Sequence, residues 1–192
     1  MPDPIEQLDR AIAQTGRVVH DVRPDQLDLR TPCDEWDVRA LLVHTVDVIE
    51  RVTGAVTGQA PEPGDESSDL AAIVAAYDRA AEASARAWQE PGVLDRELQA
   101  SWGPTPGDRI CRLNLADTVV HGWDVARATG QPYAVDSQSL DAVHDFVHSF
   151  SADGTPGLFG PRVPVPDTAP LLDRVIGMAG RDPTWSPLLD QP

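Results

Sequence analysis

The sequence contains no lysine, and its basic residues are few. All 15 are arginine, against 31 acidic residues, and the formal net charge is −16. Binding to nucleic acid needs a basic face that neutralises phosphates. The charge balance therefore excludes nucleic acid as an expected partner.

Cysteines and long apolar runs are also scarce. Two cysteines, Cys33 and Cys111, are too few for a disulfide framework in 192 residues. No run approaches the roughly 20 apolar residues that cross a bilayer, and the acidic, amphipathic N-terminus MPDPIEQLDRAIAQ is unlike a secretory signal. We expect a cytoplasmic protein that does not enter the membrane, with reduced thiols. The length predicts a single domain over residues 1–192.

Sequence motifs of the common nucleotide-binding and hydrolase sites are missing: there is no P-loop, no Gly-rich dinucleotide motif and no GxSxG elbow. What the sequence has instead is helical periodicity. It predicts a first helix from Pro4 to before Pro24. A second helix begins at Thr31–Pro32, has Asp34 and Glu35 in its first turn, and is weakened at its far end by Gly54 and Gly58. Further helices are predicted over residues 70–90 and 108–129, from residue 136 onward, and over residues 171–178. Ser68 or Asp69 is expected to cap the third helix, and residues 93–107 are a loop or short hairpin. The pattern predicts an all-α bundle.

The predicted helix over residues 108–129 carries polar residues within its apolar stripe. Asp117 and His121 stand at i and i+4, where their side chains meet on one face. Burying them without a partner would cost roughly a few kcal/mol. A carboxylate and an imidazole in that geometry can share a metal ion or pair with each other. Asp124, one turn further on, is placed to orient the imidazole of His121.

His44, on the flank of the stripe of the second predicted helix, is the candidate third partner. His44, Asp117 and His121 together would leave a coordination position open, as in catalytic zinc sites. The alternative is an intrahelical Asp117–His121 ion pair with an unrelated interfacial histidine. Spacing alone leaves these two interpretations evenly balanced.

A rival metal pair is formed by His144 and His148, also at i and i+4. These two lack an evident third ligand, because only His20 remains, and a solvated helix face explains them adequately. Cys33, near the predicted start of the second helix, is a packed or capping thiol or else a nucleophile whose pKa is lowered by the helix dipole. Cys111 is expected to be structural.

Three segments resemble a known family. TPCDEWDVRALLVHTVD is similar to the metal-binding helix of the DinB-like superfamily, in the branch related to mycothiol-dependent maleylpyruvate isomerase. LADTVVHGWDVARATGQP resembles the second signature of that branch, a carboxylate four residues before a histidine that is followed by a Trp-Asp pair. FGPRVPVPDTAPLLDRVIGMAGRDPTW is similar to the closing segment of a small single-domain subgroup.

The resemblance implies a DinB-like antiparallel four-helix bundle with a long crossover and extra C-terminal helices. It implies a divalent metal ion held by His44, Asp117 and His121, with Zn favoured and Ni, Fe or Mn also accepted. Many members have a third histidine, and the isomerase a glutamate, where this sequence has Asp117. The chain is also shorter than the isomerase and is expected to lack its separate C-terminal domain.

Three functions are open at this point. The first is a metal-dependent enzyme, a transferase or isomerase, that uses a low-molecular-weight thiol; the resemblance favours mycothiol as the thiol. Trp123 would help to shape its pocket. The second is metal-assisted hydrolysis, for which no residue stands out as the general base. The third is a non-catalytic metal- or ligand-binding bundle. We also expect that the protein acts on a small-molecule substrate and forms a homodimer.

Overall fold

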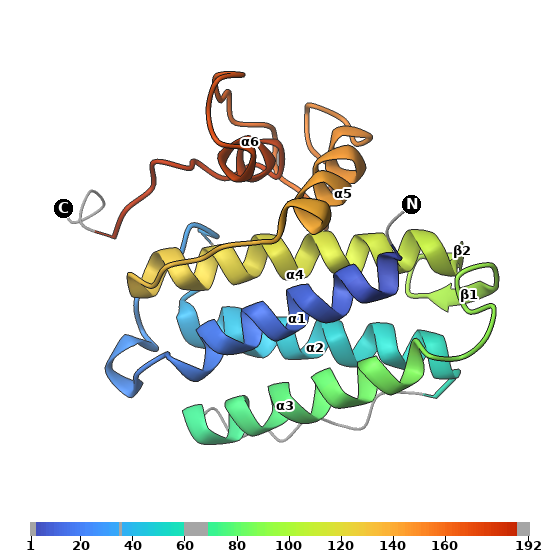
Figure 1. Cartoon of the computed structure of the whole chain (residues 1–192). Helices are drawn as coiled ribbons and strands as arrows, with labels where there is room; N and C mark the ends of the chain where they lie inside the picture. The colour runs from blue at the N-terminus through green and yellow to red at the C-terminus, as the bar shows by residue number, and fades with distance from the viewer. Residues whose placement is uncertain (1–2, 35, 60–68, 188–192) are drawn as a thin grey trace.

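Four long helices dominate the computed structural model, which describes residues 3–34, 36–59 and 69–187 (Figure 1). Within these residues the regular elements are helices apart from one short two-stranded hairpin, so the all-α prediction is confirmed. The elements are α1 (Pro4–His20), a 3-10 turn η1 (Pro24–Gln26), α2 (Val38–Thr57), α3 (Leu70–Ala87), β1 (Glu97–Ala100), β2 (Gly103–Pro106), α4 (Gly107–Thr129), α5 (Ser137–His148) and α6 (Leu171–Met178).

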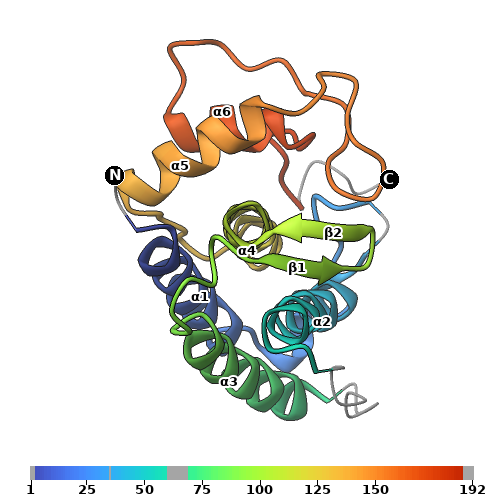
Figure 2. The same ribbon diagram turned by 90° about the vertical axis from the view of Figure 1, so that its right-hand side faces the viewer.

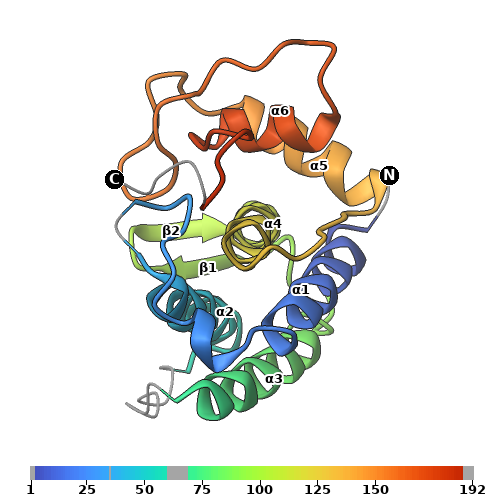
Figure 3. The same cartoon turned by 90° about the vertical axis from the view of Figure 1, so that its left-hand side faces the viewer.

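The helices α1 to α4 lie side by side around a shared apolar core. α4 contacts α1 and α2, and α3 contacts the same two helices from the opposite side. Figures 2 and 3 look along the four axes from the two ends and show this arrangement. α1 and α4 run in one direction and α2 and α3 in the other (Figure 1). The antiparallel arrangement therefore holds for α2 against α4 and for α1 against α3, while the pairs α1/α4 and α2/α3 run parallel.

α4 is the central element, because α1 and α2 cover one side of it and α5 covers the other. From Asn114 onward nearly all of its side chains are buried. Gly122 allows the close approach of α1 and of the segment after α4: a Cβ at this position would collide with the hydroxyls of Thr15 and Tyr133. Thr15 also donates a hydrogen bond to the backbone oxygen of Thr118, 3.2 Å away. These contacts fix the position of α4, and with it the position of its polar side chains, relative to α1.

The start of α2 differs from the prediction. The helix begins at Val38, where the side chain of Asp37 accepts a hydrogen bond from Ala40 N at 2.8 Å. Thr31 instead closes a turn, because its hydroxyl donates to the backbone oxygens of Cys33 and Trp36 at 3.0 and 2.8 Å. Asp34 therefore lies in the turn and not in a helix, and Glu35 lies outside the described residues. The prediction took Thr31 as the entry to the helix, whereas its hydroxyl is bound within the preceding turn.

The other predicted boundaries agree closely with the structure. α2 continues through Gly54 and ends before Gly58, whose φ of 72° forms the C-cap. Asp69 occupies the N-cap position of α3, whereas Ser68 lies outside the described residues. Asp136 caps α5 through a hydrogen bond from Ser139 N. Residues 97–106 form the short hairpin, with Leu98 opposite Thr105.

α5 and α6 pack on each other and form a layer over α4 on the side away from α2 and α3 (Figures 2 and 3). The segment after α6 then returns toward the C-terminal half of α4 (Figure 1). Among the residues that the structure describes, no helix is long and apolar enough to cross a membrane.

Candidate metal centre

The contact between α2 and α4 brings His44, Asp117 and His121 together. Each of the three offers one ligand atom, and these atoms all lie within 4.8 Å of one another. Nε2 of His121 is 3.5 Å from Oδ1 of Asp117, and the rings of His44 and His121 meet edge to face with centroids 5.0 Å apart. A purely intrahelical ion pair gives no reason for His44 to join from another helix.

Asp124 holds the opposite side of the His121 ring. Its side chain is fully buried, and Oδ2 lies 3.0 Å from Nδ1 of His121. Since a carboxylate accepts, the imidazole donates from Nδ1, and Nε2 is the ring nitrogen that faces Asp117 and that a metal ion would use. A carboxylate in this role is the usual outer support of a metal-binding histidine, because it fixes the tautomer and the orientation of the ring. The predicted role of Asp124 matches this geometry.

Arg181, from the segment after α6, supplies the counter-charge that Asp124 needs. Its Nε and Nη2 lie 3.4 and 3.3 Å from Oδ2 of Asp124, and only 10% of its side chain is exposed. Its Nη1 donates to the backbone oxygen of Ala179 at 3.0 Å. Arg181 is not predictable from the sequence pattern, because 57 residues separate it from Asp124 and no local periodicity connects them.

Trp36 forms an aromatic wall of the site. Its ring centroid is 4.1 Å from that of His44 and 5.8 Å from that of His121. The residue precedes α2 and is placed by the Thr31 turn. Trp123, the pocket tryptophan expected from the sequence, is buried and has Arg127 over its ring, 5.7 Å from the centroid. The signal for Trp36 was its position in the same motif as His44, just before the helix.

The two imidazoles have different electrostatic surroundings. Burial lowers the pKa of His44, and this outweighs the attraction of Asp117. Burial also lowers the pKa of His121, but Asp117 and the hydrogen bond to Asp124 outweigh burial and raise it overall. Burial therefore favours the neutral form of His44. Without a metal ion, Asp117 and Asp124 favour the protonated form of His121, and a metal ion bound at Nε2 would displace that proton.

The donor set fits a divalent metal ion. Tetrahedral zinc, with ligands at about 2.0–2.2 Å, separates its donor atoms by about 3.3–3.5 Å. The distance of 3.5 Å between Nε2 of His121 and Oδ1 of Asp117 already falls in this range. All three ligand atoms lie within 4.8 Å of one another, so a small inward movement of the side chains would bring them to the spacing of a zinc site. Two imidazoles and one carboxylate suit zinc and several other first-row metals.

Comparison with known proteins places this site in a family. The protein-family model with the description "Mycothiol maleylpyruvate isomerase N-terminal domain" matches residues 8–126, which include His44, Asp117 and His121. The chain belongs to this family. Two sequences from Mycobacterium tuberculosis strains, Uncharacterized protein Rv0738 and Uncharacterized protein MT0763, are each 31% identical over 184 residues, covering 93% of this chain and 98% of their own.

The solved structure that matches shows the same fold. The crystal structure of the mycothiol-dependent maleylpyruvate isomerase superposes with a TM-score of 0.58 at 12% identity, over 75% of this chain and 68% of the isomerase. The all-α DinB-like fold and the relation to the isomerase branch are thus both confirmed. The family match ends at residue 126, so Arg181 belongs to the part of the chain beyond it.

The remaining histidines of this family member lie elsewhere. His144 and His148 stack on α5 with ring centroids 6.0 Å apart, and among the described residues no third ligand group joins them. His20 pairs instead with Asp78, at 2.8 Å between Nε2 and Oδ1. His144 and His148 therefore lack a third metal ligand among the described residues.

The two cysteines lie in different surroundings. Cys33 lies in the turn before α2, so the expected effect of a helix dipole on its thiol is wrong; its Sγ is 3.6 Å from Nη2 of Arg181. Cys111 is buried in α4, and burial raises the pKa of its thiol to about 12. That environment agrees with the structural role expected for Cys111.

Proposed function

We propose that His44, Asp117 and His121 bind one divalent metal ion, with zinc favoured and nickel, iron or manganese as alternatives. The observation that carries the proposal is the convergence of His44 from α2 on the Asp117–His121 pair of α4. The buried support of His121 by Asp124 strengthens it. Three protein ligands leave a position open, which is the arrangement of a catalytic rather than a structural site.

The proposed reaction uses a low-molecular-weight thiol, with mycothiol favoured by the family. A divalent metal ion, when bound, lowers the pKa of a coordinated thiol and so increases the thiolate fraction. The thiol sulfur forms a bond to an electrophilic carbon of the substrate, and the thiol proton passes to solvent. Departure of a leaving group with its bonding electrons completes a transfer, whereas isomerisation requires rearrangement and expulsion of the thiol.

The residues of this chain would act mainly by orientation. Asp124 keeps the proton of His121 on Nδ1, and Arg181 pairs with the fully buried carboxylate of Asp124 on its other side. Asp117 supplies the single negative charge of the ligand set. Trp36 covers the face of His44 and limits the access of water from that side.

The test is a thiol-transfer assay with zinc-loaded protein. Mycothiol and the electrophile 1-chloro-2,4-dinitrobenzene are mixed with the protein, and the aryl thioether is followed by absorbance. We expect turnover that the His44→Ala and Asp117→Ala variants lose and that His20→Ala, an imidazole outside the site, retains. Equal rates in all four proteins would contradict the proposal.

The assay also separates the alternative functions. Retained zinc without thiol turnover would favour the non-catalytic binding bundle. Zinc-dependent cleavage of an ester such as p-nitrophenyl acetate without added thiol would favour metal-assisted hydrolysis. Neither alternative has a specific structural observation in its favour.

A further inference from the structure

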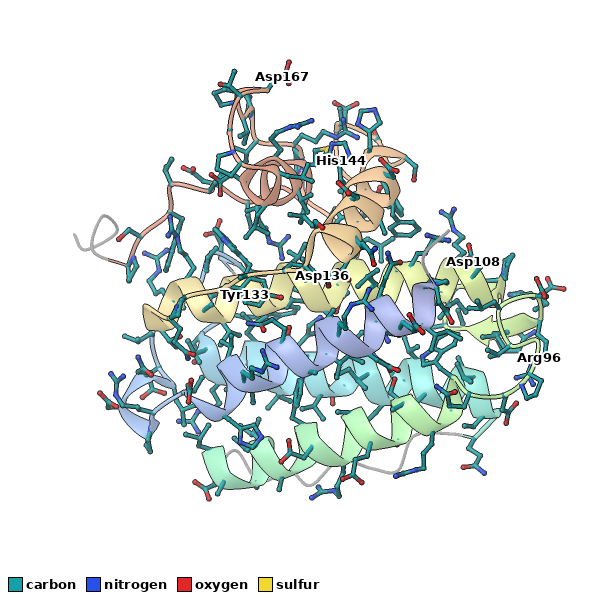
Figure 4. The ribbon with its side chains drawn as sticks, in the orientation of Figure 1. Arg96, Asp108, Tyr133, Asp136, His144 and Asp167 are labelled. Carbon is teal, nitrogen blue, oxygen red and sulfur yellow. The ribbon has the colours of Figure 1, made fainter. Side chains whose placement is uncertain are left out.

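A cavity outside the proposed metal centre lies between α5, α6 and the segment over residues 162–167. Its volume is about 330 Å³, near the lower end of the range for small-molecule pockets. Figure 4 shows His144 and Asp167 on the outer side of α5 and α6, away from α2. The lining residues are His144, His148, Arg162, Val163, Pro164, Val165, Asp167, Arg174 and Met178.

The charge of this cavity is opposite to that of the protein. Arg162 and Arg174 face a single carboxylate, that of Asp167, among the lining residues. The cavity is thus positively charged even with both histidines neutral, in a chain whose net charge is −16. Local positive charge in an acidic protein selects anionic ligands, because the remaining surface repels them.

The hydrogen bonds of His144 argue against a metal ion at this place. Nη2 of Arg174 lies 3.3 Å from Nε2 of His144, and Nδ1 lies 3.3 Å from Oδ1 of Asp145. A guanidinium only donates, so Nε2 accepts and the ring proton is on Nδ1. The lone pair that a metal would need is already directed at a cation. The His144–His148 spacing therefore has a different use.

Arg162 is held rigidly at the same cavity. Its Nη2 donates to the backbone oxygens of His148 and Phe150, both at 2.9 Å. Its Nε is buried and has no hydrogen-bond partner within the described parts of the chain. A guanidinium fixed in this way loses little side-chain entropy when an anion binds in the cavity.

The remaining wall of the cavity is apolar. Val163, Val165 and Met178 form it, and Val163 N donates to Gly177 O at 2.9 Å. Gly177 makes this packing possible, because a Cβ there would collide with Val165 and with the backbone of Val163. The wall is therefore fixed against α6.

We propose that this cavity binds a small organic monocarboxylic acid. The carboxylate contacts the guanidinium groups of Arg162 and Arg174, and a short apolar chain lies against Val163, Val165 and Met178. A second negative group on the ligand would meet Asp167, so a monocarboxylate is preferred to a dianion. The inference is independent of the proposed metal-dependent function.

The experiment uses pentanoate as the probe and the imidazole proton resonances of the five histidines as the readout, with His144 and His148 assigned from His144→Gln and His148→Gln spectra. We expect saturable shifts of these two resonances, with little change at His20. Arg174→Gln should raise the Kd at least tenfold, and Arg174→Lys should raise it less. Arg86→Gln, the same charge change at an exposed site on α3, should leave the Kd unchanged.

Neutral and dianionic probes complete the test. Pentanamide, which has the same size without the charge, should bind at least tenfold more weakly than pentanoate. Equal binding of pentanamide, tighter binding of inorganic phosphate, or equal weakening by Arg86→Gln would overturn the proposal. Shifts of His144 and His148 with Zn²⁺ and none with pentanoate would also overturn it, in favour of a metal-binding pair.

Discussion

Asp124 and His121 are joined by a hydrogen bond of 3.0 Å on a single helix, one turn apart, and both side chains are buried. The pair connects the apolar core to the candidate metal centre, since Asp124 is fully buried and His121 faces Asp117 on its other side. Arg181 ties the same carboxylate to the segment after α6. The C-terminal part of the chain therefore contributes to the site without supplying a ligand.

The buried ion pair can be tested by Asp124→Asn. This change leaves Arg181 buried without its carboxylate, which costs about 3–5 kcal/mol in the free energy of unfolding. Zinc affinity should fall about 10–100-fold, because His121 loses its support. Chemical denaturation and zinc titration measure both effects.

Two further variants serve as controls for Asp124→Asn. Asp141→Asn, on the exposed face of α5, should change neither quantity. Asp124→Asn combined with Arg181→Met should recover part of the stability but not the zinc affinity. A double variant as unstable as the single one would mean that the Asp124–Arg181 pair is not the cause.

The close approach at Gly122 predicts a steric effect. In Gly122→Ala the added methyl group meets the hydroxyls of Thr15 and Tyr133. Overpacking of this kind costs roughly 1–3 kcal/mol, of which the better helix propensity of alanine returns up to about 1 kcal/mol. The free energy of unfolding should fall by about 1–2 kcal/mol. Thr15→Ala in the same chain should relieve part of the loss, and strictly additive effects of the two changes would argue against the contact.

The cap of α5 predicts a dependence of stability on pH. Burial raises the pKa of Asp136, but hydrogen bonds from Ser139 and the pairing with Arg10 outweigh it and lower the pKa overall. A lowered pKa stabilises the folded state above the unfolded-state pKa of about 4, and this stabilisation is lost as the pH falls through the folded-state value. Figure 4 shows Asp136 at the start of α5.

Asp136→Asn isolates the charge, because asparagine is also a good N-cap. We expect the parent protein to be more stable than this variant at pH 6 and the difference to shrink below pH 4. Denaturation at pH 6, 5, 4 and 3.5 measures the difference. A gap that stays constant over this range would show that the charge of Asp136 does not contribute.

The sequence predicted most of the helices and three members of the site because these features are local. The i, i+4 spacing of Asp117 and His121 follows from helix geometry, and Gly130 and Gly58 mark helix ends through their left-handed conformation. His44 was a candidate from its place on the second predicted helix, but spacing alone left its pairing with Asp117 and His121 evenly balanced, because spacing does not say which helices pack together. The single-domain organisation stays a prediction, because the family match covers residues 8–126 only.

Arg181, Trp36 and the start of α2 were not predictable by the same means. Arg181 reaches Asp124 through tertiary packing of the segment after α6, which no periodicity describes. Trp36 and Cys33 are held by the hydrogen bonds of Thr31 in a turn, at the place where the sequence predicted the first turn of a helix. Side chains positioned by loops leave little trace in helical patterns.

Zinc content after equilibrium dialysis of the parent protein beside His44→Ala, Asp117→Ala and His20→Ala tests the central claim most directly. We predict about one zinc per chain in the parent protein and in His20→Ala, and loss of the metal from the other two. Equal zinc in all four proteins, or none in the parent protein, would contradict a metal centre at His44, Asp117 and His121.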